Sequence, residues 1–236
     1  MVSTGVRLLW FSALAALCVT ACTGSPPGPH ASAAPTPKPA GAASPVSPAN
    51  IRRLRAAFPR GYEVADADGS SSPTRFWGLG ADSSADPAQC ASLADPLGGR
   101  GASPQGLSGS GAGGIVYVVV AGAPAPPVVL DAAVVDDRAR WSMAAARTTA
   151  TVALTPAPPI EGAATMAMHT ALRTVVEGGT QTEVQAQTAT AYLGDCLVFV
   201  TVVTDPGSPQ PQLPPDFAST FLVRTAATLR DPSPGG

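Results

Sequence analysis

The sequence predicts an α+β fold in which a twisted antiparallel β-sheet of about five strands is packed by an N-terminal and a C-terminal helix. Residues 115–121 (IVYVVVA) and 196–204 (CLVFVTVVT) are β-branched runs without polar alternation, which is typical of strands covered on both faces. Segments 165–176 and 181–192 are joined by a Gly-Gly pair, which indicates a hairpin. An apolar helical stripe at each end of this region completes the pattern.

The first element expected is a short helix that begins after Ser47 and is ended by Pro59. Serine is a favoured N-cap, and Pro48 suits the first turn because its missing N–H has no helical partner there. Three apolar residues would form its buried face: Ile51, Leu54 and Phe58.

Residues 59–113 are rich in Gly, Ser, Asp and Pro, and we expect mostly loop there. The one strand-like piece is 75–78 (RFWG), and one helical turn is expected around Cys90. The glycine-rich run 106–114 leads into a strand and lacks lysine, whereas a phosphate-binding loop opens a helix. Its expected role is to let the backbone pass close to a neighbour or a ligand, or to be mobile.

The sheet is expected to begin at Gly114 and to include 147–155 (RTTATVALT) before the long hairpin. A two-residue turn at Gly178 and Gly179 would fix the hairpin register. In that register Glu177 faces Thr180, Arg173 faces Val184, and His169 faces Thr188.

The last element expected is an amphipathic helix over 217–230, which follows Pro214-Pro215-Asp216. Four residues form its apolar stripe: Phe217, Phe221, Leu222 and Leu229. We expect both helices to pack on the sheet.

The N-terminus has the pattern of a lipoprotein signal peptide. Arg7 precedes an apolar run that is shorter than the ~20 residues of a membrane span but suits a secretory signal. The run ends in Val19-Thr20-Ala21-Cys22, which has the form of a bacterial lipobox: an aliphatic residue, two small residues and the cysteine that receives diacylglycerol. Cys22 is thus the expected lipidation site and the new N-terminus. The alternative is an ordinary signal peptide with a chance cysteine.

Three parts are expected along the chain: a signal peptide at 1–21, a lipidated cysteine with a Pro-rich tether at 22–49, and a single α+β domain at 50–231. The tether has eight prolines and neither aromatic nor acidic residues, so it cannot bury enough apolar surface to order. It would reach between roughly 30 Å as a coil and roughly 80 Å if extended at ~3.1 Å per residue. The expected location is the extracytoplasmic face of the cell membrane.

The charge does not indicate a nucleic-acid partner, and none is expected. Without residues 1–21 the chain carries 13 basic and 16 acidic residues, a net charge near −3, and no cluster of Lys or Arg follows Cys22. Attachment to the membrane is therefore expected through the lipid alone.

The domain contains two cysteines, Cys90 and Cys196. Outside the cytoplasm such a pair is expected to form a disulfide, which in the chain-entropy model would contribute about 4 to 5 kcal/mol. The alternative is two buried free thiols, which the apolar surroundings of Cys196 permit.

No catalytic, metal-binding or cofactor-binding set is expected. His169 is the one histidine in the domain, and no nucleophile motif accompanies it, so a strand position beside a hydroxyl is the better interpretation. A zinc site would need several closely spaced His or Cys ligands. The acidic stretch at 63–69 lacks the spacing of a calcium loop and is expected to be solvated.

Several segments resemble an uncharacterised family of mycobacterial lipoproteins, from about residue 50 to the end. They are GYEVA, RFWGLG, SGSGAGGIVYVVVAG, RTVVEGGTQT, AYLGDCLVFVTVVTDPGS and FASTFLVRTAATLR, together with the lipobox and tether. That family is distantly similar to the extracellular sensor domain of the kinase PknH. The resemblance implies a twisted antiparallel sheet with helices and a ligand cleft. The sensor domain has two disulfides, whereas this chain has cysteines for one.

The function expected is a non-catalytic binding or sensing module for an envelope ligand, either a small molecule or an envelope protein. Trp77 and Trp141, with Arg173 as a polar contact, are the candidates for the lining of its cleft, and a buried core position is the alternative for either tryptophan. A structural lipoprotein that holds partner proteins is the second hypothesis, and an enzyme is the third.

Overall fold

The computed structural model describes residues 45–67, 69–70, 72–80, 82–123, 140–204 and 209–232. The expected signal peptide, Cys22 and most of the tether lie outside these residues. Within the described ranges, no helix has both the length and the apolar character that a membrane span requires.

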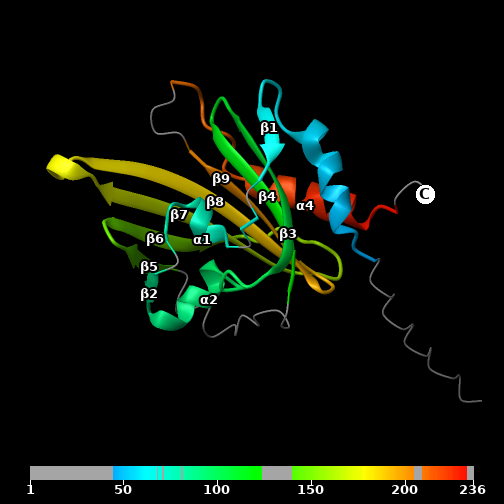
Figure 1. The fold of residues 1–236 in the computed structure, drawn as a ribbon, viewed down its shortest axis with the longest axis horizontal. Helices are drawn as coiled ribbons and strands as arrows, with labels where there is room; N and C mark the ends of the chain where they lie inside the picture. Colours follow the sequence, from blue (N-terminus) through cyan, green and yellow to red (C-terminus); the bar gives the residue numbers. More distant parts are fainter. Residues whose placement is uncertain are drawn as a thin grey trace, which may run out of the picture. The chain divides into compact units, whose positions relative to one another are not determined.

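A nine-stranded sheet forms the centre of the domain, with every neighbouring pair antiparallel, in the order β1-β3-β4-β9-β8-β7-β6-β5-β2 (Figure 1). The strands are β1 (Glu63–Asp66), β2 (Ser84–Asp86), β3 (Ala102–Gly111), β4 (Gly114–Gly122), β5 (Arg140–Ala145), β6 (Thr148–Thr155), β7 (Ala164–Val175), β8 (Gln181–Leu193) and β9 (Cys196–Val203). The α+β class is confirmed, but the expected number of about five strands is wrong.

The additional strands escaped prediction because their sequences carry little β signal. β1 and β2 are edge strands of four and three residues, and β3 is the glycine-rich run expected to be loop. In β3, a Cβ at Gly109 would overlap the ring of Phe58, and one at Gly111 would overlap the ring of Tyr62. The expected close approach of backbone to a neighbour is thus correct, but it occurs within a strand.

Two groups of helices cover the two faces of the sheet. The 3-10 helix η1 (Pro48–Ala57) and α4 (Phe217–Arg230) lie against one face, where Val198 and Val200 of β9 pack with Leu222. On the other face lie α1 (Pro73–Phe76), η2 (Ala88–Cys90) and α2 (Ala91–Ala94). Successive residues of β9 point to opposite faces, so this strand contributes apolar side chains to both layers.

The expected C-terminal helix is confirmed as α4, with Phe221, Leu222 and Leu229 buried. Each such side chain contributes about 1.5 to 3 kcal/mol when removed from water. The N-terminal helix is also present, but as a 3-10 helix, and the side chain of Ser47 makes no capping hydrogen bond. Its backbone N–H instead donates to the carbonyl of Leu229, at 2.9 Å.

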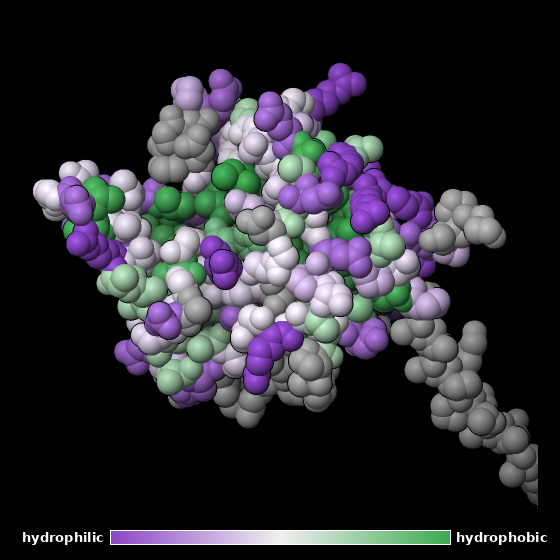
Figure 2. Space-filling model, viewed as in Figure 1, coloured by the Kyte–Doolittle hydropathy of each residue, from purple (hydrophilic) through white to green (hydrophobic). Residues whose placement is uncertain are grey.

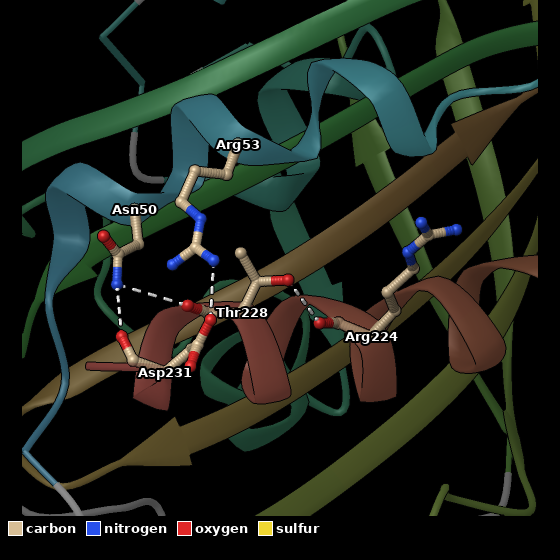
Figure 3. A network of polar contacts seen from close by, with 5 residues as sticks. All are labelled: Asn50, Arg53, Arg224, Thr228 and Asp231. Carbon is tan, nitrogen blue, oxygen red and sulfur yellow. Dashed lines mark hydrogen bonds and ion pairs between the residues drawn. The ribbon is translucent and has the colours of Figure 1, made fainter. Parts of the chain in front are cut away.

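A polar clasp joins η1 to the end of α4, so the two ends of the domain lie side by side (Figure 3). Buried Asn50 donates from Nδ2 to the carbonyls of Thr228 (3.3 Å) and Asp231 (2.8 Å). Arg53 forms an exposed ion pair with Asp231 at 2.6 Å. The residues from Ser47 onward are therefore held against α4.

The long hairpin is confirmed as β7 and β8, but its predicted register is wrong by one residue. Arg173 faces Glu183, and His169 faces Gln187. The turn has three residues, η3 (Glu177–Gly179), and is closed by a bond from the N–H of Val176 to the carbonyl of Thr180. Both glycines have the expected positive φ, of 84° and 80°, but the third turn residue shifts every cross-strand pair.

The RFWG segment is not a strand, because Arg75 and Phe76 belong to α1 and Trp77 follows as its C-cap. Pro73 occupies the first turn of this short helix, and Gly78, which follows the C-cap, has a positive φ of 87°. The segment crosses one face of the sheet, and the ring of Phe76 stacks on that of Tyr117 in β4 at 4.3 Å between centroids.

The predicted disulfide is not formed, and Cys90 and Cys196 are two free, buried thiols. Cys196 lies on the face covered by α4, in the same cluster as Val198 and Leu222. Cys90 packs on the opposite face, in the cluster that contains Trp77 and Trp141. A bond between them would have to cross the sheet, so the alternative of two free thiols is correct.

Candidate functional site

The two tryptophans expected to line a cleft lie in the core. Trp77 and Trp141 are 4% and 3% exposed, and both belong to the apolar cluster on the face covered by α1 and α2. The indole N–H of Trp77 donates to Thr188 at 2.9 Å, and Thr188 is hydrogen-bonded in turn to Thr201 at 3.0 Å. The alternative of a core position is therefore the one found for both residues.

Trp141 differs from Trp77 because its indole nitrogen, although buried, has no hydrogen-bond partner among the described residues. The hydroxyl of Thr170 is likewise buried without a partner. Both residues pair with Val152 of β6, one from each side, so they lie in one row across the same face of the sheet. This row lies within the core and contains two polar atoms, the indole nitrogen of Trp141 and the hydroxyl of Thr170.

Arg173, the expected polar contact, lies on the hairpin and points away from this cluster. It is exposed and forms an ion pair with Glu183 at 2.7 Å, a consequence of the observed register. The two residues lie on the face opposite to Trp77, since Leu172 of the same strand belongs to the tryptophan cluster. The three predicted site residues are therefore not brought together.

His169 is half-buried on β7, between Ala153 and Gln187 of the adjoining strands. The residues that the structure describes contain no group of three His, Cys, Asp or Glu side chains able to hold a metal ion. Burial raises the pKa of Cys196 to about 11, with a further contribution from neighbouring Asp195, so this thiol is protonated at neutral pH. A protonated thiol is a poor nucleophile.

A recess of about 600 Å³ lies over α1 and α2, and we call it the Ser72 recess. Its polar lining includes Ser70, Ser72, Thr74, Arg75, Asp95 and Arg100, and its apolar lining includes Leu79 and Met143. In Figure 2 the area over α1 and α2 is mostly hydrophilic or near-neutral, and hydrophobic residues gather beside it over the central strands. The recess is thus a polar opening above the apolar tryptophan cluster.

The carboxylate of Asp95 organises one wall of the recess. It accepts a hydrogen bond from the hydroxyl of Ser72 at 2.7 Å and another from the N–H of Gly99 at 3.3 Å. Ser72 is also hydrogen-bonded to Thr74 at 2.8 Å. Ser72 and Thr74 are both buried, so these bonds tie the start of α1 to the loop that follows α2.

Two arginines stand at this opening. Arg75 is on α1, and Arg100 follows the turn in which Gly98 and Gly99 take positive φ values of 54° and 70°. That turn is closed by a bond from the N–H of Arg100 to the carbonyl of Leu97 at 2.9 Å. Among the described residues, neither guanidinium has an ion-pair partner.

A smaller groove of about 410 Å³ shares Ser70 and Arg75 with the Ser72 recess. Phe76 and Tyr117, whose rings are stacked, form its aromatic wall. Asp66 lies at its edge and is paired with Arg55 at 2.6 Å. Arg75 lines both depressions, so its side chain can contact a ligand bound in either one.

Sequence reasoning missed the Ser72 recess because its residues come from loops and one short helix, without periodicity. The available signal was compositional: small polar residues and glycines between 69 and 100, interrupted by isolated arginines. Such a stretch is indistinguishable from solvated loop until the fold brings residues 70–75 next to 95–100.

Residues 47–230 match the family described as Domain of unknown function (DUF5642), and the chain belongs to this family. Among solved structures, the chain is similar to the X-ray structure of an uncharacterised protein, an Rv0999 orthologue, from Mycobacterium smegmatis. That similarity has a TM-score of 0.59 at 19% identity and covers 79% of this chain and 98% of the other. It supports the fold alone. No curated protein matches the chain.

Proposed function

We propose that this chain is a lipid-anchored extracytoplasmic protein whose domain binds a small envelope ligand in the Ser72 recess. The observation that carries the proposal is the recess itself: polar groups from two separate segments converge over an apolar floor formed by Leu79 and Met143. This combination of a concave, partly apolar site with a few fixed polar groups is typical of ligand sites. The distant resemblance to the PknH-type sensor domain gives the same expectation.

The anchor is proposed from the lipobox that ends at Cys22. Two or more acyl chains on one residue give stable attachment, where a single chain is marginal. The Pro-rich tether would then hold the domain off the membrane surface, with the recess accessible to molecules of the envelope.

Binding rather than catalysis is proposed because the described lining of the recess offers hydroxyls but no histidine that could activate one of them as a nucleophile. Its carboxylate, Asp95, already accepts two hydrogen bonds from the protein. The other polar side chains of the described lining are hydroxyls and guanidinium ions. These groups are suited to recognition by hydrogen bonding and charge.

Two fractionation results test the anchor. Globomycin, which blocks lipoprotein signal peptidase, should cause the full-length precursor to accumulate. A Cys22→Ser variant should leave the membrane fraction, and a variant that stayed membrane-bound would refute the lipid anchor.

A blocking substitution tests the recess. Ser92 is an exposed residue of α2 at the lining, so Ser92→Trp should fill part of the opening without disturbing the core. Val223→Trp is the matched control, because Val223 is exposed on α4 at the other face of the sheet. The full chain would be purified from envelope in detergent and analysed by native mass spectrometry. Bound small molecules that are lost in Ser92→Trp and retained in Val223→Trp would support the proposal, and equal retention would refute it.

A second candidate function is the binding of an envelope protein by the β7–β8 hairpin. Val175 and Val176, at 39% and 41% exposed, lie next to its turn, and this end of the hairpin projects from the sheet (Figure 1). A photo-crosslinking amino acid at Val176 should then capture one defined protein in cells, while the same group at Val223 should not. Absence of a product specific to position 176 would remove this candidate.

A further inference from the structure

We infer that the Ser72 recess recognises an anionic group, a phosphate, sulfate or carboxylate carried by a small ligand, and that Arg75 and Arg100 bind it. This inference rests on the proposed function, because it assigns the chemistry of the ligand to the same recess. The argument comes from the charge of the lining, from the hydrogen bonds already made there, and from the placement of the two arginines.

The charge of the recess is opposite in sign to that of the chain. Among the residues that the structure describes, its charged lining residues are Arg75, Arg100 and Asp95, which gives a formal charge of +1 for this part of the lining. The whole chain has a formal charge of −2. The local positive charge of the lining favours an anionic ligand over a cationic one at close range, although the net negative charge of the chain does not attract anions from a distance.

The hydrogen bonds inside the recess leave mainly donors for a ligand. An ionised carboxylate only accepts, so Ser72 must donate its hydroxyl proton to Asp95, and the Ser72 oxygen then accepts from Thr74. Both hydroxyl protons are therefore used within the protein. Ser70 accepts from the N–H of Ser72 at 3.2 Å, which leaves its own O–H able to donate outward.

The guanidinium groups supply most of the remaining donors. Each carries five N–H donors in a planar arrangement that matches the oxygens of a carboxylate or phosphate. In the part of the chain that the structure describes, the side chains of Arg75 and Arg100 make neither a hydrogen bond nor an ion pair. The three arginine ion pairs found among the described residues, by contrast, each join two structural elements.

The two arginines come from segments that the protein fixes relative to each other. Arg75 is three residues beyond Ser72, and Arg100 directly follows Gly99. Asp95 bonds to both Ser72 and Gly99, so its carboxylate sets the separation of the segments that carry the two guanidinium groups. Asp95 therefore acts as a positioning residue for an anion site formed by these arginines.

Titration calorimetry of the full chain in neutral detergent tests this inference with glucose 1-phosphate, inorganic phosphate and methyl glucoside as probes. Arg75→Gln and Arg100→Gln should each weaken the binding of the phosphorylated probes at least tenfold, and the double variant should abolish it. Arg52→Gln is the matched control, because Arg52 is an exposed arginine of η1 on the other face of the sheet. Vesicles with and without phosphatidylinositol form a separate arm, which distinguishes a lipid headgroup from a free phosphate compound.

Two results would overturn the inference. One is an equal loss of phosphate binding in Arg52→Gln, which would indicate non-specific charge attraction. The other is binding of methyl glucoside that is unchanged in the double variant and absent in Ser92→Trp, which would leave the recess as a site for a neutral ligand. Failure of every probe to bind also refutes the anion inference, whereas the proposed function fails only if envelope-derived ligands are retained in Ser92→Trp.

Discussion

The clasp between η1 and α4 predicts that Asn50 is far more important for stability than the ion pair beside it. Asn50 is 5% exposed and satisfies two carbonyls at the end of α4, those of Thr228 and Asp231. In Asn50→Ala both carbonyls lose their donor, at hydrogen bonds that are part-buried. Leaving a buried polar group unsatisfied costs about 1 to 3 kcal/mol, and partial burial together with the 3.3 Å length of one bond lowers this cost, so a total of about 2 kcal/mol is expected for the two groups.

The neighbouring substitution Arg53→Gln provides the comparison. Arg53 and Asp231 have side chains that are 44% and 50% exposed, and exposed ion pairs contribute about 0 to 1 kcal/mol. Removal of this pair should therefore cost about 0.5 kcal/mol or less. Both substitutions lie in η1 and remove a contact with Asp231, but only Arg53→Gln removes a charge. Arg53→Gln should nevertheless lower the free energy of unfolding less than Asn50→Ala does.

Urea unfolding followed by tryptophan fluorescence measures both variants, because Trp77 and Trp141 are buried and should shift to longer wavelength on exposure. With a urea slope of about 2 kcal/mol per molar, Asn50→Ala should lower the midpoint by about 1 M, and Arg53→Gln by about 0.2 M. A midpoint for Asn50→Ala within 0.3 M of the unmodified protein, or equal shifts in the two variants, would refute the reasoning.

Three further predictions concern the sheet. Gly109→Ala should destabilise the domain by about 1 to 3 kcal/mol in urea unfolding because its Cβ would overlap a packed phenyl ring, whereas Gly80→Ala, which meets no atom within 4 Å, should be nearly neutral. Thr188→Val should cost about 1 to 3 kcal/mol because it leaves the indole N–H of Trp77 without an acceptor, and Thr188→Ser should restore most of that stability. The raised pKa of Cys196, about 11 against a usual 9.0, favours the protonated thiol in the folded state, so its contribution is present below pH 9 and is lost as pH rises through 11. Native Cys196 should accordingly react with iodoacetamide only slowly at pH 8, and a fast reaction there would contradict the assignment.

The sequence predicted the elements that carry strong local patterns. The apolar runs of β4 and β9 and the stripe of α4 are long enough for periodicity and composition to identify them. β3 was not predicted because its sequence is rich in glycine, which is unusual in strands. Gly109 and Gly111 are required there because the rings of Phe58 and Tyr62, distant in the chain, occupy the space that a Cβ would need. The one-residue error in the hairpin has a similar origin, since two glycines with positive φ are compatible with turns of two or three residues.

The candidate site was beyond sequence reasoning for a physical reason. Large aromatic side chains such as Trp77 and Trp141 are suited to contact a ligand, but their size makes them equally suited to fill the core. The residues that form the recess are small and polar, and their common location depends on the bonds of Asp95 to Ser72 and Gly99. The free cysteines show the same limit, because the number of cysteines in a chain does not reveal which face of a sheet each one occupies.

The clasp also determines how the domain would carry a mechanical load. A force applied through a tether enters at Ser47, whose N–H is bonded to Leu229, and passes next to Asn50 and its two acceptors in α4. The first structure to resist is therefore a pair of packed helices, not an edge strand that could be unzipped from the sheet one hydrogen bond at a time. Because both ends of the domain are held at the same place, a pull on the N-terminus would act first on this junction and not on a strand at the edge of the nine-stranded sheet.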